Sequence, residues 1–221
     1  PQNVAHYRAV AKGGAGLIIQ EATCISPEGR LSEDQLGIWS DDQIPGLREI
    51  TEAVHQEGCP IFVQLHHAGL VSIGQDTLCP SDYAMDTKKG WKNGHEMTRD
   101  DILRIRDAFI QAAVRAEKAG YDGVEPHGCH GYLLCQFLNN RVNRRTDEYG
   151  KTERLVLEIL EGIRASVRPD FVVGIRLGAF EPTLEDGISH AKILQAHGIQ
   201  FLDVSYGFAA ESDPAAPGDP E

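Results

Sequence analysis

The segment His127-Gly-Cys-His130-Gly-Tyr132 has the highest density of side chains that can do acid–base or electrostatic chemistry. It follows a short apolar run, so two imidazoles and a phenol are expected at the carboxyl end of a strand, where α/β barrel enzymes place their active sites. Two histidines three residues apart on a turn can direct two N–H donors at one oxygen and stabilise negative charge developing on a carbonyl group. Tyr132 can then supply a proton to the same ligand.

Other interpretations of this segment stay open on the local pattern alone. His130 can cap a helix, and Tyr132 can simply pack against its neighbours. A metal site that adds Cys129 or Cys135 to the two histidines is a third interpretation, but the segment lacks the C-x-x-C spacing or the fixed third ligand typical of such sites. We therefore predict no metal site.

Polar side chains that interrupt apolar runs elsewhere in the chain are further site candidates. Gln64 and His66 share one face of a predicted strand because side chains alternate with period two. The Gln64 amide can pair with the edge of a heterocycle such as a flavin pyrimidine ring, or it can bond a neighbouring strand. Arg176 needs an anion or an electron-rich partner at a strand end. The N1–C2 locus of a reduced flavin meets that need, as does an ion pair with Glu125 or Asp203.

The elements that must position these residues alternate along the chain. Apolar, β-branched runs bounded by glycine or proline predict strands, and the stretches between them predict helices, an order typical of parallel strands joined by crossover helices. The predicted strands are Gly16–Ile25, Pro60–Ala68, Tyr121–His127, Phe171–Leu177 and Ile199–Ser205. The predicted helices are Gln43–Glu57, Thr98–Ala119, Thr152–Val167, Leu184–His197 and a short one before Gly13. Thr98 and Asp101 suit a capping box, and Gly58 and Gly120 are placed to end helices.

Long polar loops are predicted after three of the strands, at Pro27–Asp42, Leu70–Met97 and Gly128–Lys151. Long loops in compact domains are usually functional or disordered, and barrel enzymes carry their function on this side of the strands. We expect one domain over residues 1–207, followed by an acidic, Pro- and Ala-rich tail at residues 208–221 without regular structure.

The composition argues against several classes of function. Asp and Glu total 33 against 21 Lys and Arg, a formal charge of −12, and no basic block marks a nucleic-acid or anionic-membrane binder. No apolar run reaches the roughly 18–20 residues that span a bilayer, and Pro1–Val10 does not resemble a secretory signal. The 5 cysteines lack zinc-finger spacing and are expected to be reduced thiols. We predict a soluble, cytoplasmic protein that binds neither nucleic acid nor membranes.

Taken together, the motifs resemble the Old Yellow Enzyme family, the FMN-dependent ene-reductases of the NADH:flavin oxidoreductase group. The resemblance rests on segments in the family's order: His6-Tyr7 and GGAGLIIQEAT, then SPEGRLSEDQLGIWSDDQIPGL, QLHHAG, HGCHGYLLCQFLNNRVNRRTDEYG and GIRL. It implies an α/β fold, a TIM (β/α)8 barrel, with about five of the eight βα units in this chain. It also implies FMN as the cofactor and NADH or NADPH as the reductant.

The resemblance assigns roles to matching positions. The residues expected to contact FMN are Ala22 through its backbone, Gln64, Arg176 and His127. The residues expected to bind the substrate are His127, His130 and His66. The catalytic residues are expected to be Tyr132, His127 and His130.

The implied reaction is the reduction of an activated alkene, an enone or a nitro compound. NAD(P)H reduces FMN, the flavin N5 hydride goes to the β-carbon, His127 and His130 polarise the activating oxygen, and Tyr132 protonates the α-carbon. This small molecule is the expected partner, and a homo-oligomer is an option.

Some features differ from the family pattern. Leu70 follows His67-Ala68-Gly69 in place of the family's arginine, and Lys151-Thr152 follow Tyr149-Gly150 in place of Gly-Ser. Because only five strands are predicted, we expect a segment of a longer enzyme that by itself is at best a weak flavin binder. The alternatives are a noncatalytic barrel segment acting as a binding or assembly module, a 2,4-dienoyl-CoA reductase-like relative, and a metal-dependent hydrolase.

Overall fold

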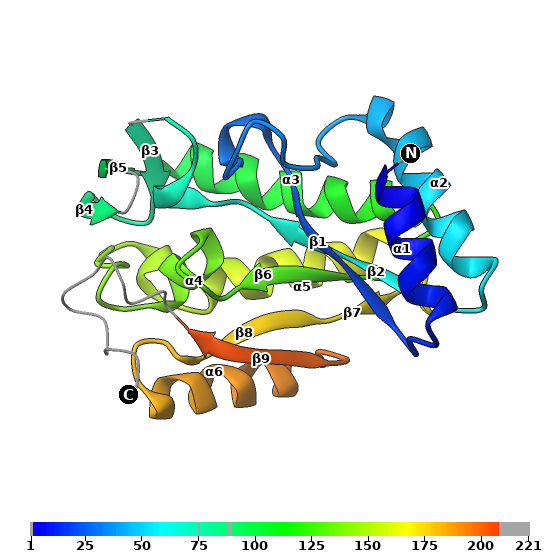
Figure 1. The fold of residues 1–221 in the computed structure, drawn as a ribbon. Helices are drawn as coiled ribbons and strands as arrows, with labels where there is room; N and C mark the ends of the chain where they lie inside the picture. Colours follow the sequence, from blue (N-terminus) through cyan, green and yellow to red (C-terminus); the bar gives the residue numbers. More distant parts are fainter. Residues whose placement is uncertain (1, 75, 88–89, 208–221) are drawn as a thin grey trace, which may run out of the picture.

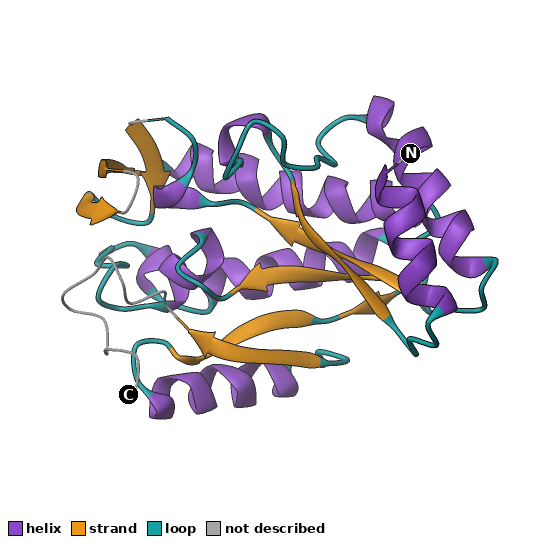
Figure 2. Ribbon diagram, in the orientation of Figure 1, coloured by secondary structure: helices purple, strands orange, loops and turns teal. Residues whose placement is uncertain are grey.

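A parallel β-sheet with the strand order β1-β2-β6-β8-β9 is the centre of the fold (Figures 1 and 2). The computed structural model describes residues 2–74, 76–87 and 90–207 of the chain. The strands are β1 Ile18–Cys24, β2 Ile61–His66, β6 Gly123–Gly128, β8 Ile175–Phe180 and β9 Leu202–Gly207, and the short β7 Val172–Val173 pairs with β6. All five predicted strands are therefore confirmed in position and order.

The fourth predicted strand is divided by Gly174 into β7 and β8. A Cβ atom at Gly174 would lie 1.9 Å from a ring carbon of Phe201, so only glycine fits where the Phe201 side chain crosses the backbone. Glycine weakens a strand and often marks such a close approach. The single strand predicted over Phe171–Leu177 is thus wrong in its continuity, although its location is right.

The helices are α1 Gln2–Lys12, α2 Ile44–His55, α3 Arg99–Lys118, α5 Arg154–Ser166 and α6 Leu184–Ala196. They confirm the five predicted helices, and the ends of the four with predicted limits differ by at most two residues. Thr98 and Asp101 form the expected capping box. Gly58 and Gly120 take left-handed φ values of 76° and 93° just after their helices, as predicted.

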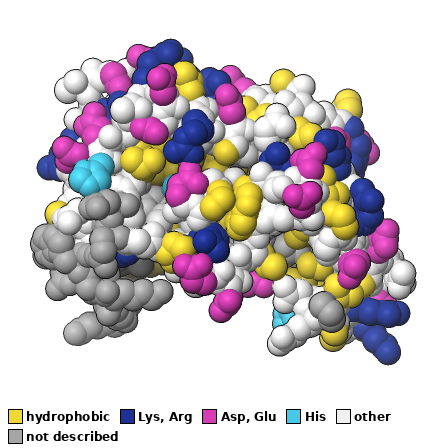
Figure 3. Space-filling view, turned by 90° about the horizontal axis from the view of Figure 1, so that it is seen from above, with side chains coloured by type: hydrophobic (Ala, Val, Ile, Leu, Met, Phe, Trp, Pro, Cys, Tyr) yellow, Lys and Arg dark blue, Asp and Glu magenta, His cyan; other side chains and the backbone are white. Residues whose placement is uncertain are grey.

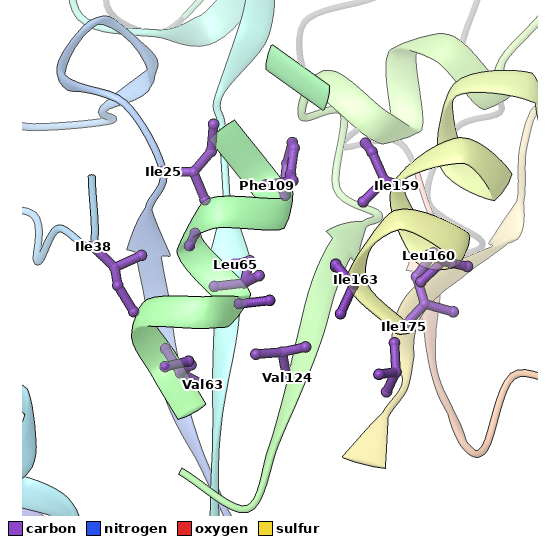
Figure 4. Packing of buried hydrophobic residues seen from close by; sticks show 14 of the residues in the cluster. Ile25, Ile38, Val63, Leu65, Phe109, Val124, Ile159, Leu160, Ile163 and Ile175 are labelled. Atoms are coloured by element: carbon purple, nitrogen blue, oxygen red, sulfur yellow. The ribbon is translucent and has the colours of Figure 1, made fainter. Parts of the chain in front are cut away.

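The main hydrophobic core lies between the sheet and the helices that cover one of its faces (Figure 4). Val63 and Leu65 of β2 point toward this layer, beside α3 and its Phe109, and the aliphatic side chains of α5 belong to the same cluster. Burying one such side chain contributes about 1.5–3 kcal/mol. Because side chains alternate along a strand, Gln64 and His66 face the other side of the sheet.

Two elements fall in segments that were predicted to be loops. The prediction for Leu70–Met97 is wrong: it forms a small sheet of β3 Asp76–Cys79, β4 Tyr83–Thr87 and β5 Gly90–Glu96, in the order β3-β5-β4. Within Gly128–Lys151 lies the short helix α4 Leu133–Leu138. The small sheet lacks an alternating apolar pattern and is held by its backbone ladder, which periodicity does not detect. Figure 1 shows it and α4 at the end of the molecule toward which the main strands run.

The predicted tail, residues 208–221, lies outside the described residues, so its lack of regular structure stays a prediction. No helix in residues 2–207, as far as they are described, is long and apolar enough to cross a membrane. On the face shown in Figure 3, acidic and basic side chains are interspersed.

Candidate active site

The register of the sheet brings together polar residues that the sequence scatters over more than 100 positions. Gln64 of β2 lies opposite Glu125 of β6, and His127, two residues further along β6, lies opposite Arg176 of β8. Arg176 in turn lies opposite Asp203 of β9. Since parallel strands in register present matching residues to one face, these side chains form a polar row on the side away from the helices.

The turn that follows β6 has a left-handed backbone at two consecutive residues. His130 has φ 58° and Gly131 has φ 72°, and His130 is the one non-glycine residue in the described chain with a positive φ. This conformation costs a non-glycine residue about 1–2 kcal/mol. The Gly131 N–H donates to Cys135 Sγ at 3.2 Å, and Gln136 Nε2 donates to the Gly131 carbonyl at 2.7 Å. These bonds anchor the turn to α4.

The turn places four rings in mutual contact at the ends of β2 and β6. The His127 ring centroid lies 5.1 Å from that of His130 and 4.9 Å from that of Tyr132. The His66 ring lies 4.5 Å from Tyr132 and 5.6 Å from His127. The structure therefore brings together the residues predicted for catalysis and substrate binding, while their roles stay predictions.

Burial keeps these histidines neutral. It lowers the pKa of His127 to about 2 and that of His66 to about 3, and the neighbouring imidazoles act in the same direction. Burial also lowers the pKa of His130, which is half-buried. A neutral imidazole presents one N–H donor, so the cluster suits binding of an acceptor oxygen. Burial raises the pKa of Tyr132, which therefore keeps its phenolic proton.

Gln64 and Glu125 form a buried pair next to this cluster. Gln64 Nε2 donates to Glu125 Oε1 at 2.6 Å. Burial raises the pKa of Glu125 to about 7, although this hydrogen bond opposes the shift. The bond to a neighbouring strand, one of the two interpretations of Gln64, is present, and contact with a flavin stays a prediction.

Arg176 pairs with Asp203, one of the two partners considered for it. The Arg176 Nε and Asp203 Oδ2 atoms are 3.4 Å apart, close enough for an ion pair but without the geometry of a hydrogen bond. Both side chains are about one-third exposed. The guanidinium group therefore keeps donors available on the face that carries the ring cluster.

Ala22 lies in an irregularity of β1. The register between β1 and β2 shifts between Gln20 and Thr23, so Ala22 has no partner position in that ladder. Such bulges often lie next to active sites because they redirect the backbone. The carbonyl oxygen of Ala22 accepts a hydrogen bond from Gln35 Nε2 at 2.9 Å.

Three residues at or beside the cluster were not predicted. Ser205 Oγ lies 2.7 Å from His130 Nε2, and its place at the end of a predicted strand could have indicated it. Gln35 Nε2 lies 3.1 Å from His66 Nδ1 and is in a loop without a periodic signal. Buried Glu181 lies behind the turn and accepts from Cys135 Sγ at 2.9 Å. Nothing local in the sequence marks Gln35 or Glu181.

The metal-site candidates and the cysteines are the remaining residues considered from the sequence. Within the described residues, no group of three or more His, Cys, Asp or Glu side chains is arranged to hold a metal ion. Cys129 and Cys135, the thiols considered as metal ligands, are both buried. No cysteine in the described chain is in a disulfide.

Comparison with known proteins adds a sequence relationship to this geometry. The sequence pattern of the NADH:flavin oxidoreductase / NADH oxidase family matches residues 2–213. The chain is 38% identical to the NADPH dehydrogenase of Bacillus velezensis over 96% of its own length and 65% of that protein. It is 39% identical to the NADPH dehydrogenase of Halalkalibacterium halodurans, over 94% of this chain and 63% of that protein. The chain thus spans somewhat less than two thirds of these curated relatives.

Solved structures of related proteins have the same fold as this chain. The Old Yellow Enzyme homologue from Zymomonas mobilis superposes with a TM-score of 0.80 at 34% identity, over 91% of this chain and 63% of that one. Morphinone reductase in complex with tetrahydroNAD gives a TM-score of 0.80 at 32% identity, with the same coverage. A 2-naphthoyl-CoA reductase gives 0.89 at 26% identity, over 94% of this chain and 35% of that one.

These superpositions confirm the predicted fold class: the parallel sheet and its helices are part of an Old Yellow Enzyme-type TIM barrel. The match of the family pattern over nearly the whole chain and the identities of 38–39% agree with this assignment. The chain belongs to the NADH:flavin oxidoreductase / NADH oxidase family.

Proposed function

We propose that the protein is an FMN-dependent oxidoreductase that reduces activated alkenes, enones or nitro compounds, with NADPH or NADH as the reductant. The observation that carries the proposal is the ring cluster of His66, His127, His130 and Tyr132 beside the polar row of Gln64 and Arg176. Relatives named NADPH dehydrogenase support the nicotinamide reductant.

The residues present fit a flavin. Buried side-chain atoms without a hydrogen-bond partner in the described structure include Arg176 Nε, Glu125 Oε2 and His66 Nε2, all on one face of the sheet. Such atoms are rare in folded proteins because each costs about 1–3 kcal/mol, and a polar ring system over this face accounts for them. Arg176 would hold the N1–C2 edge of FMN, and the Gln64 amide would hold its imide edge. Bound FMN supplies the hydride chemistry.

The protein's own groups bind and orient the substrate. His127 and His130 are neutral and offer N–H donors that hold and polarise the activating oxygen. Tyr132 keeps its proton because burial raises its pKa, and its hydroxyl group is the proton donor to the α-carbon. His66 packs against the Tyr132 ring in the same cluster.

A second candidate is the reduction of a CoA thioester. It is favoured by the TM-score of 0.89 with 2-naphthoyl-CoA reductase, whose solved complex contains 2-naphthoyl-CoA. This reading overlaps with a 2,4-dienoyl-CoA reductase-like role. Competition between a dienoyl-CoA and a simple enone for the oxidised flavoprotein separates the two candidates, because a CoA-specific site binds the thioester more tightly than the enone.

Titration with FMN tests the proposal directly. Flavin fluorescence is followed while the purified chain is titrated with FMN up to about 1 mM, a range that includes weak binding. We expect saturable quenching, weakened about tenfold in Gln64→Ala because one hydrogen bond is lost. The matched control Arg99→Ala removes an exposed side chain whose ion pair with Glu148 lies outside the cluster, and it should bind FMN like the wild type.

Reduction of the bound flavin by NADPH or NADH, seen as bleaching of its visible absorbance, completes the test. A chain that neither binds FMN saturably nor supports this bleaching would contradict the proposal. That result would favour the noncatalytic binding or assembly module.

A further inference from the structure

The His66 ring is fully buried and lies at the edge of the ring cluster. Its two nitrogen atoms have different surroundings. Nδ1 lies 3.1 Å from Gln35 Nε2, whereas Nε2 is buried and has no hydrogen-bond partner in the described structure. Which nitrogen bears the proton decides whether His66 offers a donor or an acceptor to a ligand.

The orientation of the Gln35 amide is fixed by two backbone groups, one that can only donate a hydrogen bond and one that can only accept one. The Leu31 backbone N–H donates to Gln35 Oε1 at 2.7 Å, so this end of the amide is the oxygen. Gln35 Nε2 donates to the Ala22 carbonyl oxygen at 2.9 Å, so this end is the nitrogen. Because a backbone N–H is only a donor and a carbonyl is only an acceptor, a flipped amide would lose both bonds.

The position of Gln35 is itself fixed by the backbone. The Leu36 carbonyl accepts from the Cys24 N–H at 2.8 Å, and the Ile38 N–H donates to the Cys24 carbonyl at 2.8 Å. Cys24 and Gly37 form a parallel bridge. The loop that carries Gln35 is therefore joined to the end of β1, next to the Cys24–His66 register pair.

It follows that His66 is the Nε2–H tautomer. The Gln35 NH2 group faces Nδ1, so Nδ1 must accept and cannot bear a proton in the neutral ring. Burial, together with the adjacent His67, lowers the pKa of His66 to about 3, so the ring is neutral at physiological pH. The proton is then on Nε2, which leaves a buried N–H donor without an acceptor.

We propose that Gln35 holds His66 as a fixed Nε2–H donor beside His127 and His130, and that this additional donor gives the site a preference for activating groups with two oxygens, as in nitroalkenes. The ligand preference rests on the proposed function, whereas the tautomer does not. The His66 and His127 ring centroids are 5.6 Å apart, and the buried Nε2 of His66 has no hydrogen-bond partner in the described structure, so a small group held by His127 lies close to the His66 donor. In a ligand with a single carbonyl, the other two histidines hold the oxygen and the His66 N–H has no acceptor. A ligand with a second oxygen supplies that acceptor.

Nitrogen-15 NMR of the histidine-labelled chain tests the tautomer without any ligand. The His66 signals are assigned by their disappearance in His66→Phe. We expect a single neutral Nε2–H form in the wild type and a mixture of both tautomers in Gln35→Met, which has a similar length but no donor for Nδ1. The control Asp34→Asn changes an exposed neighbour in the same loop and should keep the wild-type signals. An Nδ1–H form of His66 in the wild type would overturn the proposal.

Ligand binding tests the preference. The dissociation constants of 1-nitrocyclohexene and cyclohex-2-enone are measured from the perturbed visible spectrum of the FMN-loaded chain. We expect His66→Phe to lower the ratio of nitro-probe affinity to enone affinity about tenfold, the size of one lost hydrogen bond. Gln35→Met should fall between this variant and the wild type. An unchanged ratio in His66→Phe would overturn the preference even if Gln35→Met failed to fold.

The two measurements also separate this inference from the proposed function. A chain that shows the Nε2–H tautomer but binds no FMN would count against the flavin function and the ligand preference and leave the Gln35–His66 arrangement intact. A chain that binds FMN and both probes with an unchanged ratio in His66→Phe would count against the preference alone.

Discussion

At the scale of single residues, the cluster offers neutral imidazole groups rather than charges to a ligand. Burial lowers the pKa of His127 to about 2 and of His66 to about 3, so neither ring changes its protonation state between pH 5 and 8. Imidazoles that stay neutral can hold an oxygen but cannot deliver a proton efficiently. The phenol of Tyr132 is then the group in the cluster that can supply the proton.

Changing Tyr132 to Phe tests this division of roles. We expect the reduction of the alkene to slow by about 10²-fold or more, the usual contribution of a positioned acid, while reduction of the flavin by NAD(P)H changes little. Stopped-flow measurement of the two half-reactions separates these rates. Tyr149→Phe is the matched control because its hydroxyl group bonds Glu158, outside the cluster, and both rates should stay at wild-type values. Equal slowing of both half-reactions in Tyr132→Phe would remove Tyr132 as the proton donor.

At the scale of elements, the turn between β6 and α4 positions the His130 ring within the cluster. Its consecutive left-handed residues, His130 and Gly131, return the chain so that the His130 ring packs against His127. The anchors of this turn are Cys135 and Gln136, in the middle of α4. A site residue on a strand end is thus oriented by a short helix with no obvious sequence signal.

Gly131→Ala should destabilise the chain by about 1–2 kcal/mol, because alanine does not tolerate the left-handed φ of 72° at this position. The control is Gly46→Ala in the first turn of α2, where an added Cβ meets open space. That change should leave the stability unchanged or raise it by up to about 1 kcal/mol. Urea unfolding measures both variants. Equal stability of Gly131→Ala and the wild type would show that the turn adopts a different backbone.

At the scale of the whole molecule, buried titratable groups couple stability to pH in both directions. Glu181 is fully buried, and burial raises its pKa to about 7 against 4.5 for an ordinary carboxyl. Between about pH 4.5 and 7 the folded state holds a proton that the unfolded state has released, so this residue's contribution to stability falls as the pH rises. Buried His66, His67 and His127, whose pKa values burial lowers, act oppositely: below about pH 6.5 the unfolded state takes up protons that the folded state excludes.

Glu181→Gln separates the carboxyl contribution from those of His66, His67 and His127, which cancel between variant and wild type. We expect the free energy of unfolding of the wild type minus that of the variant to be larger at pH 5 than at pH 7 by about 2 kcal/mol. Chemical denaturation at several pH values measures this difference. For Glu185→Gln, an exposed residue on α6, the difference should not vary with pH. A pH-independent difference for Glu181→Gln would contradict the raised pKa.

The elements that the sequence predicts well are those whose signals are local. The spacing of Ile102, Ile105 and Phe109 and the Thr98 cap define α3 within a few turns of chain. The small sheet β3-β5-β4 escapes prediction because its strands show no apolar alternation and depend on pairing with one another. In the candidate site, too, residues with a local sequence signal were predicted and residues without one were not. His127, His130 and Tyr132 stand out as one motif, whereas Gln35 does not, because its partner His66 lies 31 residues away.

By itself, the sequence determined the order of the main parallel strands and of the five long helices, the family and the residue types available for chemistry, because these depend on composition, local spacing and short motifs. Only the tertiary structure decided the contacts among those residues. Arg176 meets Asp203, Gln64 bonds Glu125 and the Gln35 loop reaches His66. Each of these contacts depends on the register between strands or on the path of a loop. Both are set by packing over long sequence separations, where many partners are equally compatible with the local sequence.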